Sequence, residues 1–429
     1  MDFELYLNHP TPTFGAPLHL QVLLRLKGSA PADTGRTPLN LSLVLDRSGS
    51  MQGEKLEYAK SAAALLLRRL APEDVAGGVA YDDRVEPLPT GTRGAQREEL
   101  LTAVQALFPR GMTNLSGGWM VGRDQVAESR LNGGVNRVLL MTDGLANRGV
   151  TNPLALAELC REAAVGGITT TTIGFGEGFD EDLLRAMADA GGGATYYVEN
   201  PDQAPGIFEE ELLGLMSLGA QNVVVEITPE AGAPMPTLRH DYPTQRQGST
   251  VRVRLGDLYA REPRDLLLDF QLPGDFLGRA EVEGSGVGSV EVARIRIQGA
   301  VLTQGGGVET REVILPVSFN PAQGPRMEPE VASVARVLDA ADARKEALEL
   351  QASGRWDDAV ARLESQAEVL THSAPNDAGV AAEAADLQLM ASHLREDDFS
   401  AREIKYMKQQ EYDARRSRSA ASERIRRKE

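Results

Sequence analysis

The spacing of apolar and polar residues changes several times along the chain. Residues 3–7 and 18–26 alternate apolar and polar positions, as half-buried strands do. Between about residues 41 and 219, short apolar runs alternate with amphipathic helical patterns, which predicts a doubly wound, mostly parallel α/β sheet of the Rossmann-like kind. From about 221 to 319 the period of two returns without intervening helices, which predicts an antiparallel β-sandwich. Past residue 323 the composition turns helical.

These patterns divide the chain into four stretches. The strands within residues 1–36 have no partners nearby in sequence, so we expect them to pair into the sandwich. The α/β domain, residues 37–219, would then be inserted in a β-domain completed by residues 220–322, with a helical C-terminal region and basic tail at 323–429. Strands of the α/β domain are expected at 41–45, 75–81, 137–141, 169–174 and 195–198, and helices beginning near Lys55, Arg97, Ser116, Asn152, Asp180 and Asp202.

One loop of the α/β domain carries a distinctive set of oxygen atoms. The apolar run at 41–45 stops at Asp46, and Ser48, Gly49 and Ser50 follow before a helical pattern begins. The loop therefore lies at the carboxyl end of a strand, where open α/β sheets bind ligands. A carboxylate and two hydroxyls are hard ligands that suit Mg²⁺, Mn²⁺ or Ca²⁺, and not Zn²⁺ or Cu²⁺. For this motif alone, a helix cap followed by turn residues is the simpler explanation.

Two further segments change that judgement. Thr113 lies in a glycine-containing loop at 110–115, and Asp143 follows the apolar run at 138–141. Each by itself is explained as a helix cap or a turn residue. Together they resemble a von Willebrand factor A domain of the bacterial type, with a complete metal-ion-dependent adhesion site. The family pattern D-x-S-x-S, then Thr, then Asp falls on Asp46, Ser48, Ser50, Thr113 and Asp143.

The resemblance implies a binding function. These residues would hold Mg²⁺, or else Mn²⁺ or Ca²⁺, and an Asp or Glu carboxylate of a protein partner would fill an open coordination position. An adhesion, scaffold or adaptor role fits this chemistry. The resemblance also allows a regulatory cofactor of an AAA+ ATPase, whose partner would carry the phosphate-binding loop, and, with less support, a metal-dependent hydrolase.

The usual signatures of an enzyme are missing. The chain has no G-x-x-x-x-G-K-[ST], H-E-x-x-H, G-x-S-x-G or C-x-x-C motif. A general base for hydrolysis could only be a carboxylate such as Asp82 or Asp83, which we interpret instead as a solvated acidic turn, although they could also support the metal ligands. We therefore expect no catalytic residues and no enzymatic activity.

Composition narrows the choice of partner. The chain has 429 residues and a formal charge of −17, which argues against nucleic acid as the main partner. The basic tail from Ala414 carries seven Arg or Lys against two Glu. We favour a solvated helix end for it over nucleic acid or lipid binding, with contact to the acidic body as a third interpretation. No secretory signal and no apolar run of membrane-spanning length is visible, so a cytoplasmic location is expected.

Overall fold

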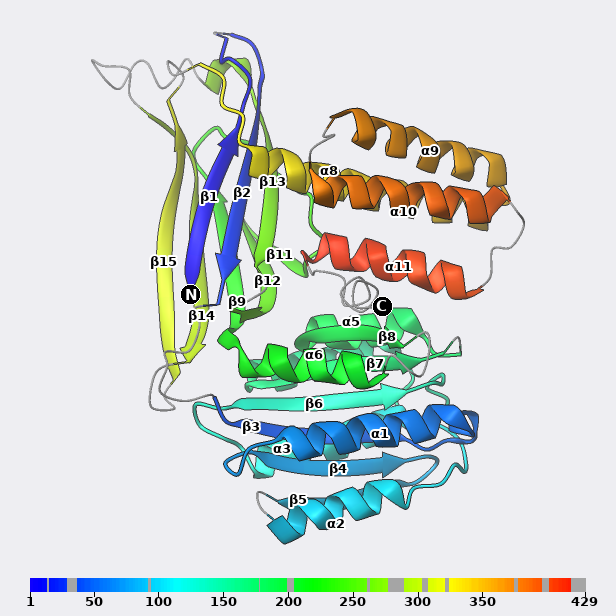
Figure 1. Ribbon diagram of the computed structural model, residues 1–429. Coiled ribbons are helices and arrows are strands. Elements are labelled where there is room, and N and C mark those ends of the chain that lie inside the picture. The colour runs from blue at the N-terminus through cyan, green and yellow to red at the C-terminus, as the bar shows by residue number, and fades with distance from the viewer. Residues whose placement is uncertain are drawn as a thin grey trace.

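The computed structural model describes residues 1–13, 15–28, 37–91, 94–176, 178–198, 204–260, 263–276, 289–302, 308–320, 324–373, 377–395 and 401–417. Figure 1 shows an α/β layer in the lower half, two long β-sheets at the upper left and a group of helices at the upper right. Among the described residues, no helix is long and apolar enough to cross a membrane.

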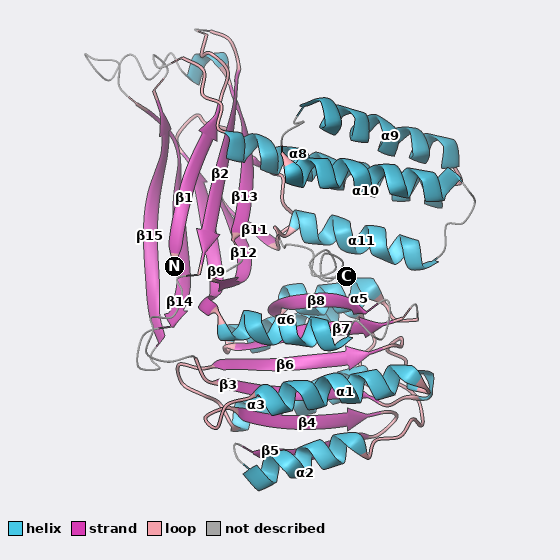
Figure 2. Ribbon diagram, in the orientation of Figure 1, coloured by secondary structure: helices cyan, strands magenta, loops and turns pink. Residues whose placement is uncertain are grey.

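The α/β layer is a mixed sheet covered by helices on both faces (Figure 2). Its strand order is β5-β4-β3-β6-β7-β8; β5 runs antiparallel to β4, and the other neighbours are parallel. The strands are β3 (Leu39–Asp46), β4 (Val75–Tyr81), β5 (Val85–Gly91), β6 (Val135–Thr142), β7 (Ile168–Phe175) and β8 (Gly192–Val198). The helices are α1 (Glu54–Arg69), α2 (Gly94–Gln105), α3 (Leu115–Glu128), α4 (Pro153–Val165), α5 (Glu181–Ala190) and α6 (Ala204–Met216).

Alternation along the buried strands explains why both faces are covered. In β3, Leu41, Leu43 and Leu45 pack in one apolar cluster with residues of α1, α2 and α6. Val44 points to the other face and packs with α3, α4 and α5. Because both faces are apolar, every residue of β3 is buried, which is the pattern expected of a central parallel strand. The α/β fold predicted from the periodicity is confirmed.

The edge strand β5 was not predicted from the sequence. It contains Pro87 and Pro89, which lack the backbone N–H that a strand paired on both sides needs. An edge strand tolerates proline because one side of its backbone has no ladder to complete. The antiparallel pairing with β4 places β5 at that edge.

The second layer system consists of two antiparallel sheets. One has the order β1-β2-β13-β10 and the other β11-β12-β9-β14-β15. Leu24 of β2 lies opposite Leu266 of β13, so strands before and after the α/β layer meet in one sheet. The strands are β1 (Asp2–Asn8), β2 (Leu18–Lys27), β9 (Leu218–Pro229), β10 (Thr237–Leu238), β11 (Thr244–Gln247), β12 (Thr250–Tyr259), β13 (Arg264–Leu272), β14 (Val290–Leu302) and β15 (Val308–Phe319).

Helices α8 (Pro329–Ala352), α9 (Trp356–Ser373), α10 (Ala378–Arg395) and α11 (Ala401–Arg415) follow the sheets. Val331 and Leu338 of α8 pack on Leu23 and Leu267, so the helical arm begins on the outer face of one sheet. Helix α11 reaches back to the α/β layer, where Lys405 donates hydrogen bonds to the carbonyl of Phe179 and to the Glu181 carboxylate, both at 2.8 Å.

The first basic residues of the tail differ from the solvated helix end that we favoured. Arg415 donates a hydrogen bond of 2.7 Å to Asp342 of α8. Arg416 pairs with Asp189 of α5 and is 8% exposed. The interpretation that the tail contacts the acidic body therefore holds for these two residues, because long-range packing brings carboxylates to them. Residues from Arg418 onward lie outside the described part of the chain.

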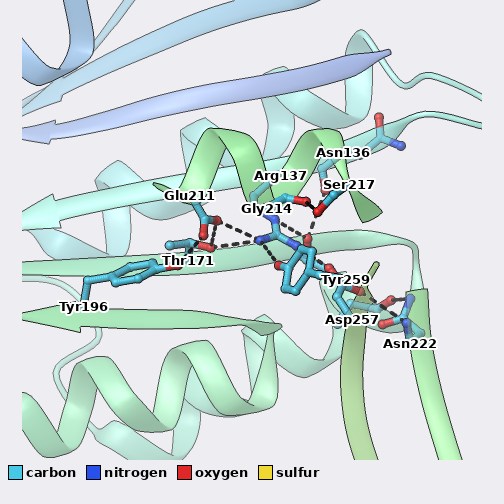
Figure 3. A network of polar contacts seen from close by, with 12 residues as sticks. Asn136, Arg137, Thr171, Tyr196, Glu211, Gly214, Ser217, Asn222, Asp257 and Tyr259 are labelled. Atoms are coloured by element: carbon cyan, nitrogen blue, oxygen red, sulfur yellow. Dashed lines mark hydrogen bonds and ion pairs between the residues drawn. The ribbon is translucent and has the colours of Figure 1, made fainter. Parts of the chain in front are cut away.

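A buried arginine joins the α/β layer to the second sheet (Figure 3). Arg137 of β6 is fully buried and lies 2.8 Å from a Glu211 oxygen of α6. The same nitrogen, Nη1, donates a hydrogen bond of 3.1 Å to the Tyr259 hydroxyl of β12, and the other terminal nitrogen, Nη2, pairs with Asp257 of that strand. One guanidinium thus connects β6 and α6 of the α/β layer to β12 of the neighbouring antiparallel sheet. These contacts fix how the α/β layer meets that sheet.

Candidate metal centre

The predicted ligand residues lie on loops at the carboxyl edge of the α/β sheet. Strands β3 and β6 are parallel neighbours, and Leu45 of β3 lies opposite Met141 of β6. Their final residues, Asp46 and Thr142, therefore reach the same edge, and Asp143 follows directly. A short 3₁₀ helix at residues 49–51 comes after Asp46, and the loop before α3 supplies Thr113.

Asp46 is the most enclosed of the five residues. One carboxylate oxygen accepts a hydrogen bond of 2.7 Å from the Ser48 backbone N–H, and the other accepts one of 2.6 Å from the Thr142 hydroxyl. Burial raises the pKa of Asp46 to about 6, against these hydrogen bonds, and the neighbouring Asp143 carboxylate raises it further. The carboxylate is thus held in one orientation in a position that disfavours its own negative charge.

Two serine hydroxyls connect Asp46 and Asp143. Ser48 is almost fully buried, and its Oγ lies 3.1 Å from that of Ser50. The Ser50 hydroxyl donates a hydrogen bond of 2.6 Å to Oδ1 of Asp143. The second oxygen, Oδ2, accepts a hydrogen bond of 2.6 Å from the ammonium group of Lys55. The carboxylate of Asp143 therefore bridges the first loop and the first turn of α1.

Thr113 completes the group from a third loop. A methyl group placed on Gly144 would lie 3.3 Å from Thr113 Oγ1 and 3.4 Å from Ser50 Oγ, so both hydroxyls converge on this glycine. The Thr113 backbone is held from both sides, because its N–H donates to the Asn147 side chain at 2.9 Å and its carbonyl accepts from the Asn147 N–H at 3.2 Å. The structure thus brings all five predicted residues together.

Backbone hydrogen bonds tie the loops to each other. Arg110 N–H donates to the Arg47 carbonyl at 2.8 Å, and Gly49 N–H donates to the Gly111 carbonyl at 3.1 Å. Gly111 has a positive φ of 69°, and a Cβ there would collide with Asp83 Oδ1 at 2.0 Å. The positive φ and this lack of space favour glycine at the point where the two loops are hydrogen-bonded.

The solvated acidic turn expected at Asp82 and Asp83 is wrong for Asp82. Its carboxylate is fully buried and accepts hydrogen bonds from Arg47 at 2.8 Å and Arg110 at 2.7 Å. Burial by itself would raise the pKa of Asp82, but the hydrogen bonds from the arginines and from the Arg84 backbone lower it below its ordinary value. A carboxylate in this state is a poor general base, and its contacts show that it supports the ligand loops.

The donor set fits a hard divalent cation. Two carboxylates and three hydroxyls from separate loops face one another, and both carboxylates are almost entirely buried. Burying a carboxylate costs free energy unless a cation or hydrogen-bond donors stabilise its charge. Two neighbouring carboxylates, Asp46 and Asp143, raise that cost because their like charges repel. Within the described ranges, no group of three or more His, Cys, Asp or Glu side chains is placed to hold a metal, and this site itself has two carboxylates, with hydroxyls as its other donors. Oxygen ligands of this kind suit Mg²⁺, Mn²⁺ or Ca²⁺.

The rim of the site is open and partly apolar. Ser50 is exposed at the surface. Met112, next to Thr113, is 44% exposed, and Leu145, two residues after Asp143, is 57% exposed. The described part of the helical arm therefore leaves these residues uncovered, and α11 lies instead against α5 (Figure 1). Two exposed apolar side chains therefore flank the polar site.

Sequence reasoning missed the groups that support the ligands. Lys55 was interpreted only as the start of a helix, and Thr142, just beyond the strand expected at 137–141, was given no role. Asn147 was not singled out. Their roles depend on contacts with residues far away in the chain, so the local pattern carried no signal for Asn147. For Thr142, its position directly before Asp143 on a strand parallel to β3 was an available signal.

Comparisons with known proteins agree with this architecture. Residues 40–210 match the model of the von Willebrand factor type A domain. The chain is 33% identical over 283 residues to an uncharacterised protein of Synechocystis sp., covering 63% of this chain and 66% of the relative. It is 30% identical over 192 residues to the uncharacterised protein YfbK of Escherichia coli, covering 44% of this chain and 33% of the relative. It thus spans at most about two thirds of the length of these relatives.

A solved structure extends the similarity to most of the fold. A von Willebrand factor type A protein from Catenulispora acidiphila superposes with a TM-score of 0.67, covering 92% of this chain and 89% of that one, at 20% identity. At this level of identity the likeness concerns the fold alone. Together with the strand order and the position of the loops, the matches lead to one conclusion: residues 40–210 of this chain form a von Willebrand factor type A domain.

Proposed function

We propose that this chain binds a protein partner through a divalent cation held by Asp46, Ser48, Ser50, Thr113 and Asp143. Von Willebrand factor type A domains generally take part in protein–protein interactions. The observation that carries the proposal is the convergence of these five oxygen-bearing side chains from separate loops at an exposed edge. A bound Mg²⁺ would supply an electrophilic centre with room for a carboxylate from an Asp or Glu of the partner.

The chain's own residues prepare the site for such a ligand. Thr142 and the Ser48 backbone orient Asp46, while Lys55 and Ser50 orient Asp143. Only two carboxylates contribute negative charge, so a divalent cation would not be over-neutralised by the protein. The exposed apolar side chains of Met112 and Leu145 would contact the surface around the incoming carboxylate. The partner is therefore expected to present an acidic residue within a partly apolar surface.

The test compares partner retention with and without metal. Wild-type protein and Thr113→Val, which removes one hydroxyl and keeps the side-chain shape, are used as bait in Mg²⁺ and in EDTA. Thr102→Val is the matched control, because the Thr102 hydroxyl bonds only the Glu98 carbonyl of its own helix. We expect one set of partners retained by wild type and by Thr102→Val in Mg²⁺, and lost with EDTA or Thr113→Val. Calorimetry with Mg²⁺ alone checks that the metal binds.

Retention of the same partners in every condition would contradict the proposal and would direct attention to the sheets and the helical arm. An ATPase among the metal-dependent partners would assign the same binding chemistry to the regulatory role. The hydrolase alternative is weakened by the two arginines that hold Asp82.

A further inference from the structure

The first turn of α1 places an ammonium group inside the candidate metal centre. Lys55 Nζ lies 2.6 Å from Oδ2 of Asp143, and the other oxygen of this carboxylate accepts the Ser50 hydroxyl. The Lys55 side chain is 33% exposed, whereas that of Asp143 is fully buried. The ion pair is therefore shielded from solvent on the carboxylate side and open to solvent on the lysine side.

The path of the lysine side chain is also defined. A Cβ on Gly176 would lie 3.2 Å from Lys55 Cε, so the chain passes close to the backbone that follows β7. Gly176 has a positive φ of 68°, which a side chain would strain in addition. The glycine thus leaves the space in which Lys55 extends from α1 to Asp143.

The other cations near the site are paired with other carboxylates or exposed to solvent. Arg47 pairs with Asp82 and Glu86, at 2.8 and 2.7 Å, and Arg110 pairs with Asp82 at 2.7 Å. Asp83 and Arg148 are exposed on the flanking loops, carry opposite charges and are screened by solvent. Lys55 is therefore the cation that contacts the ligand carboxylates among the described residues.

We propose that Lys55 acts as a fixed counter-cation that lowers the affinity of the site for its metal and raises the affinity of the metal-loaded site for a carboxylate. With Asp46, Asp143 and a divalent cation alone, the formal charges cancel. Lys55 adds one positive charge, so the loaded site is net positive and attracts an anion. This inference rests on the proposed function, and it goes further by assigning opposite effects on two binding steps to one side chain.

The physical basis is the dependence of cation affinity on ligand charge. Divalent cation sites are tuned over several orders of magnitude by the number of charged ligands. A lysine that neutralises one carboxylate therefore weakens metal binding, whereas the same charge favours a second anion. A role in which Lys55 only stabilises the fold predicts no such opposition, since a loosened site would bind both metal and carboxylate less well.

The first experiment measures metal affinity for Lys55→Met and wild type by titration of the full chain with Mn²⁺. We expect Lys55→Met to bind Mn²⁺ roughly tenfold more tightly, the change that ~1.4 kcal/mol produces. Without metal the variant should have a lower Tm, because Asp143 keeps its buried charge without a cation. Added Mn²⁺ should then raise the Tm of Lys55→Met more than that of wild type.

The second experiment uses acetate as a carboxylate probe. Water-proton relaxation by bound Mn²⁺ falls when acetate displaces water from the metal, so it reports the acetate concentration needed. We expect Lys55→Met to need several times more acetate than wild type. Lys55→Arg, which keeps the charge, should resemble wild type in both assays. Lys60→Met is the matched control, since Lys60 lies on the same helix and pairs with Glu57 at 2.8 Å.

The outcomes separate this inference from the proposed function. If wild type binds no Mn²⁺, both fail. If wild type binds Mn²⁺ and Lys55→Met binds it equally or more weakly, the counter-cation role is overturned while the metal site stands. If Lys55→Met does not fold, Lys55→Gln takes its place in the same titrations. Tighter metal with unchanged acetate affinity would also overturn the inference, because the added charge would then have no effect on the carboxylate.

Discussion

The buried arginine between the layers provides a demanding test of the structure. In Arg137→Met, the two carboxylates of Glu211 and Asp257 lose their guanidinium partner but stay buried, with exposed fractions of 2% and 3% in the wild type. The Thr169 and Thr171 hydroxyls, which accept hydrogen bonds of 2.9 and 3.2 Å from Arg137, lose that donor as well. Figure 3 shows how Glu211, Thr171 and Asp257 surround the guanidinium.

The expected loss of stability follows from the uncompensated charge. Removing one partner of a buried ion pair costs about 3–5 kcal/mol, because a charge remains without solvent or counter-ion. We take about 4 kcal/mol for Arg137→Met, which is a large part of the ~5–15 kcal/mol that stabilises a typical domain. With a urea m-value of about 2 kcal/mol/M, the unfolding midpoint should fall by about 2 M.

The assay is urea unfolding followed by tryptophan fluorescence, to which Trp119, fully buried in the α/β layer, and Trp356 of α9, 37% exposed, both contribute. Arg161→Met serves as the control, because Arg161 pairs with Glu158 on the exposed face of α4 and should contribute little. The double variant Arg137→Met/Asp257→Asn should recover part of the loss, since it removes one of the two stranded charges.

The pH dependence adds an independent check. Burial raises the pKa of Asp257 above its ordinary value, and Arg137 opposes that shift. In Arg137→Met the pKa of Asp257 rises further above that of the unfolded chain, so its protonated form is favoured in the folded state. The stability of the variant is then greater at low pH and falls as the pH rises through the folded-state pKa. We expect a deficit smaller at pH 5.5 than at pH 8; a loss below about 1 kcal/mol at pH 8, or one independent of pH, would refute the reasoning.

Two further changes test how the remaining parts are held. Lys405→Met removes one of the two lysine ion pairs, the other made by Lys408, that hold the pKa of Glu181 at about 2 in spite of burial, so hydrogen exchange of α11 should accelerate while that of α1 stays unchanged. Because the depressed pKa stabilises docking above the ordinary pKa of Glu181, the difference should shrink in acid, and equal exchange at pH 7 would contradict the contact. Gly193→Ala places a Cβ 2.1 Å from the Thr170 carbonyl oxygen and should lower the free energy of unfolding in urea by about 3 kcal/mol. Gly379→Ala, whose Cβ would lie 3.4 Å from its nearest neighbour, should be neutral. Similar stability of both variants would argue against the close approach of β7 and β8 at Gly193.

The sequence by itself determined the type and order of most elements. Leu41, Leu43 and Leu45 alternate with residues of the opposite face, and the chain direction changes at the glycine and serine residues that follow Asp46. These signals are local, because the period of apolar residues reports which side of a strand or helix is buried. The positions of Asp46 and Asp143 directly after apolar runs predicted that both lie at one edge of the sheet, since parallel strands end on the same side.

Only the tertiary structure decided which side chains meet. Lys55 contacts Asp143 across 88 positions of sequence, and Arg137 contacts Asp257 across 120. No strand was predicted at β5, whose two prolines fit an edge position that only its pairing with β4 reveals. Asp82 looked solvated because its neighbours in sequence are polar, yet Arg110 reaches it from another loop. Ion pairs of this kind form only where the folded chain brings distant segments together and buries them. The spacing of residues along one segment does not reveal which distant segments will meet.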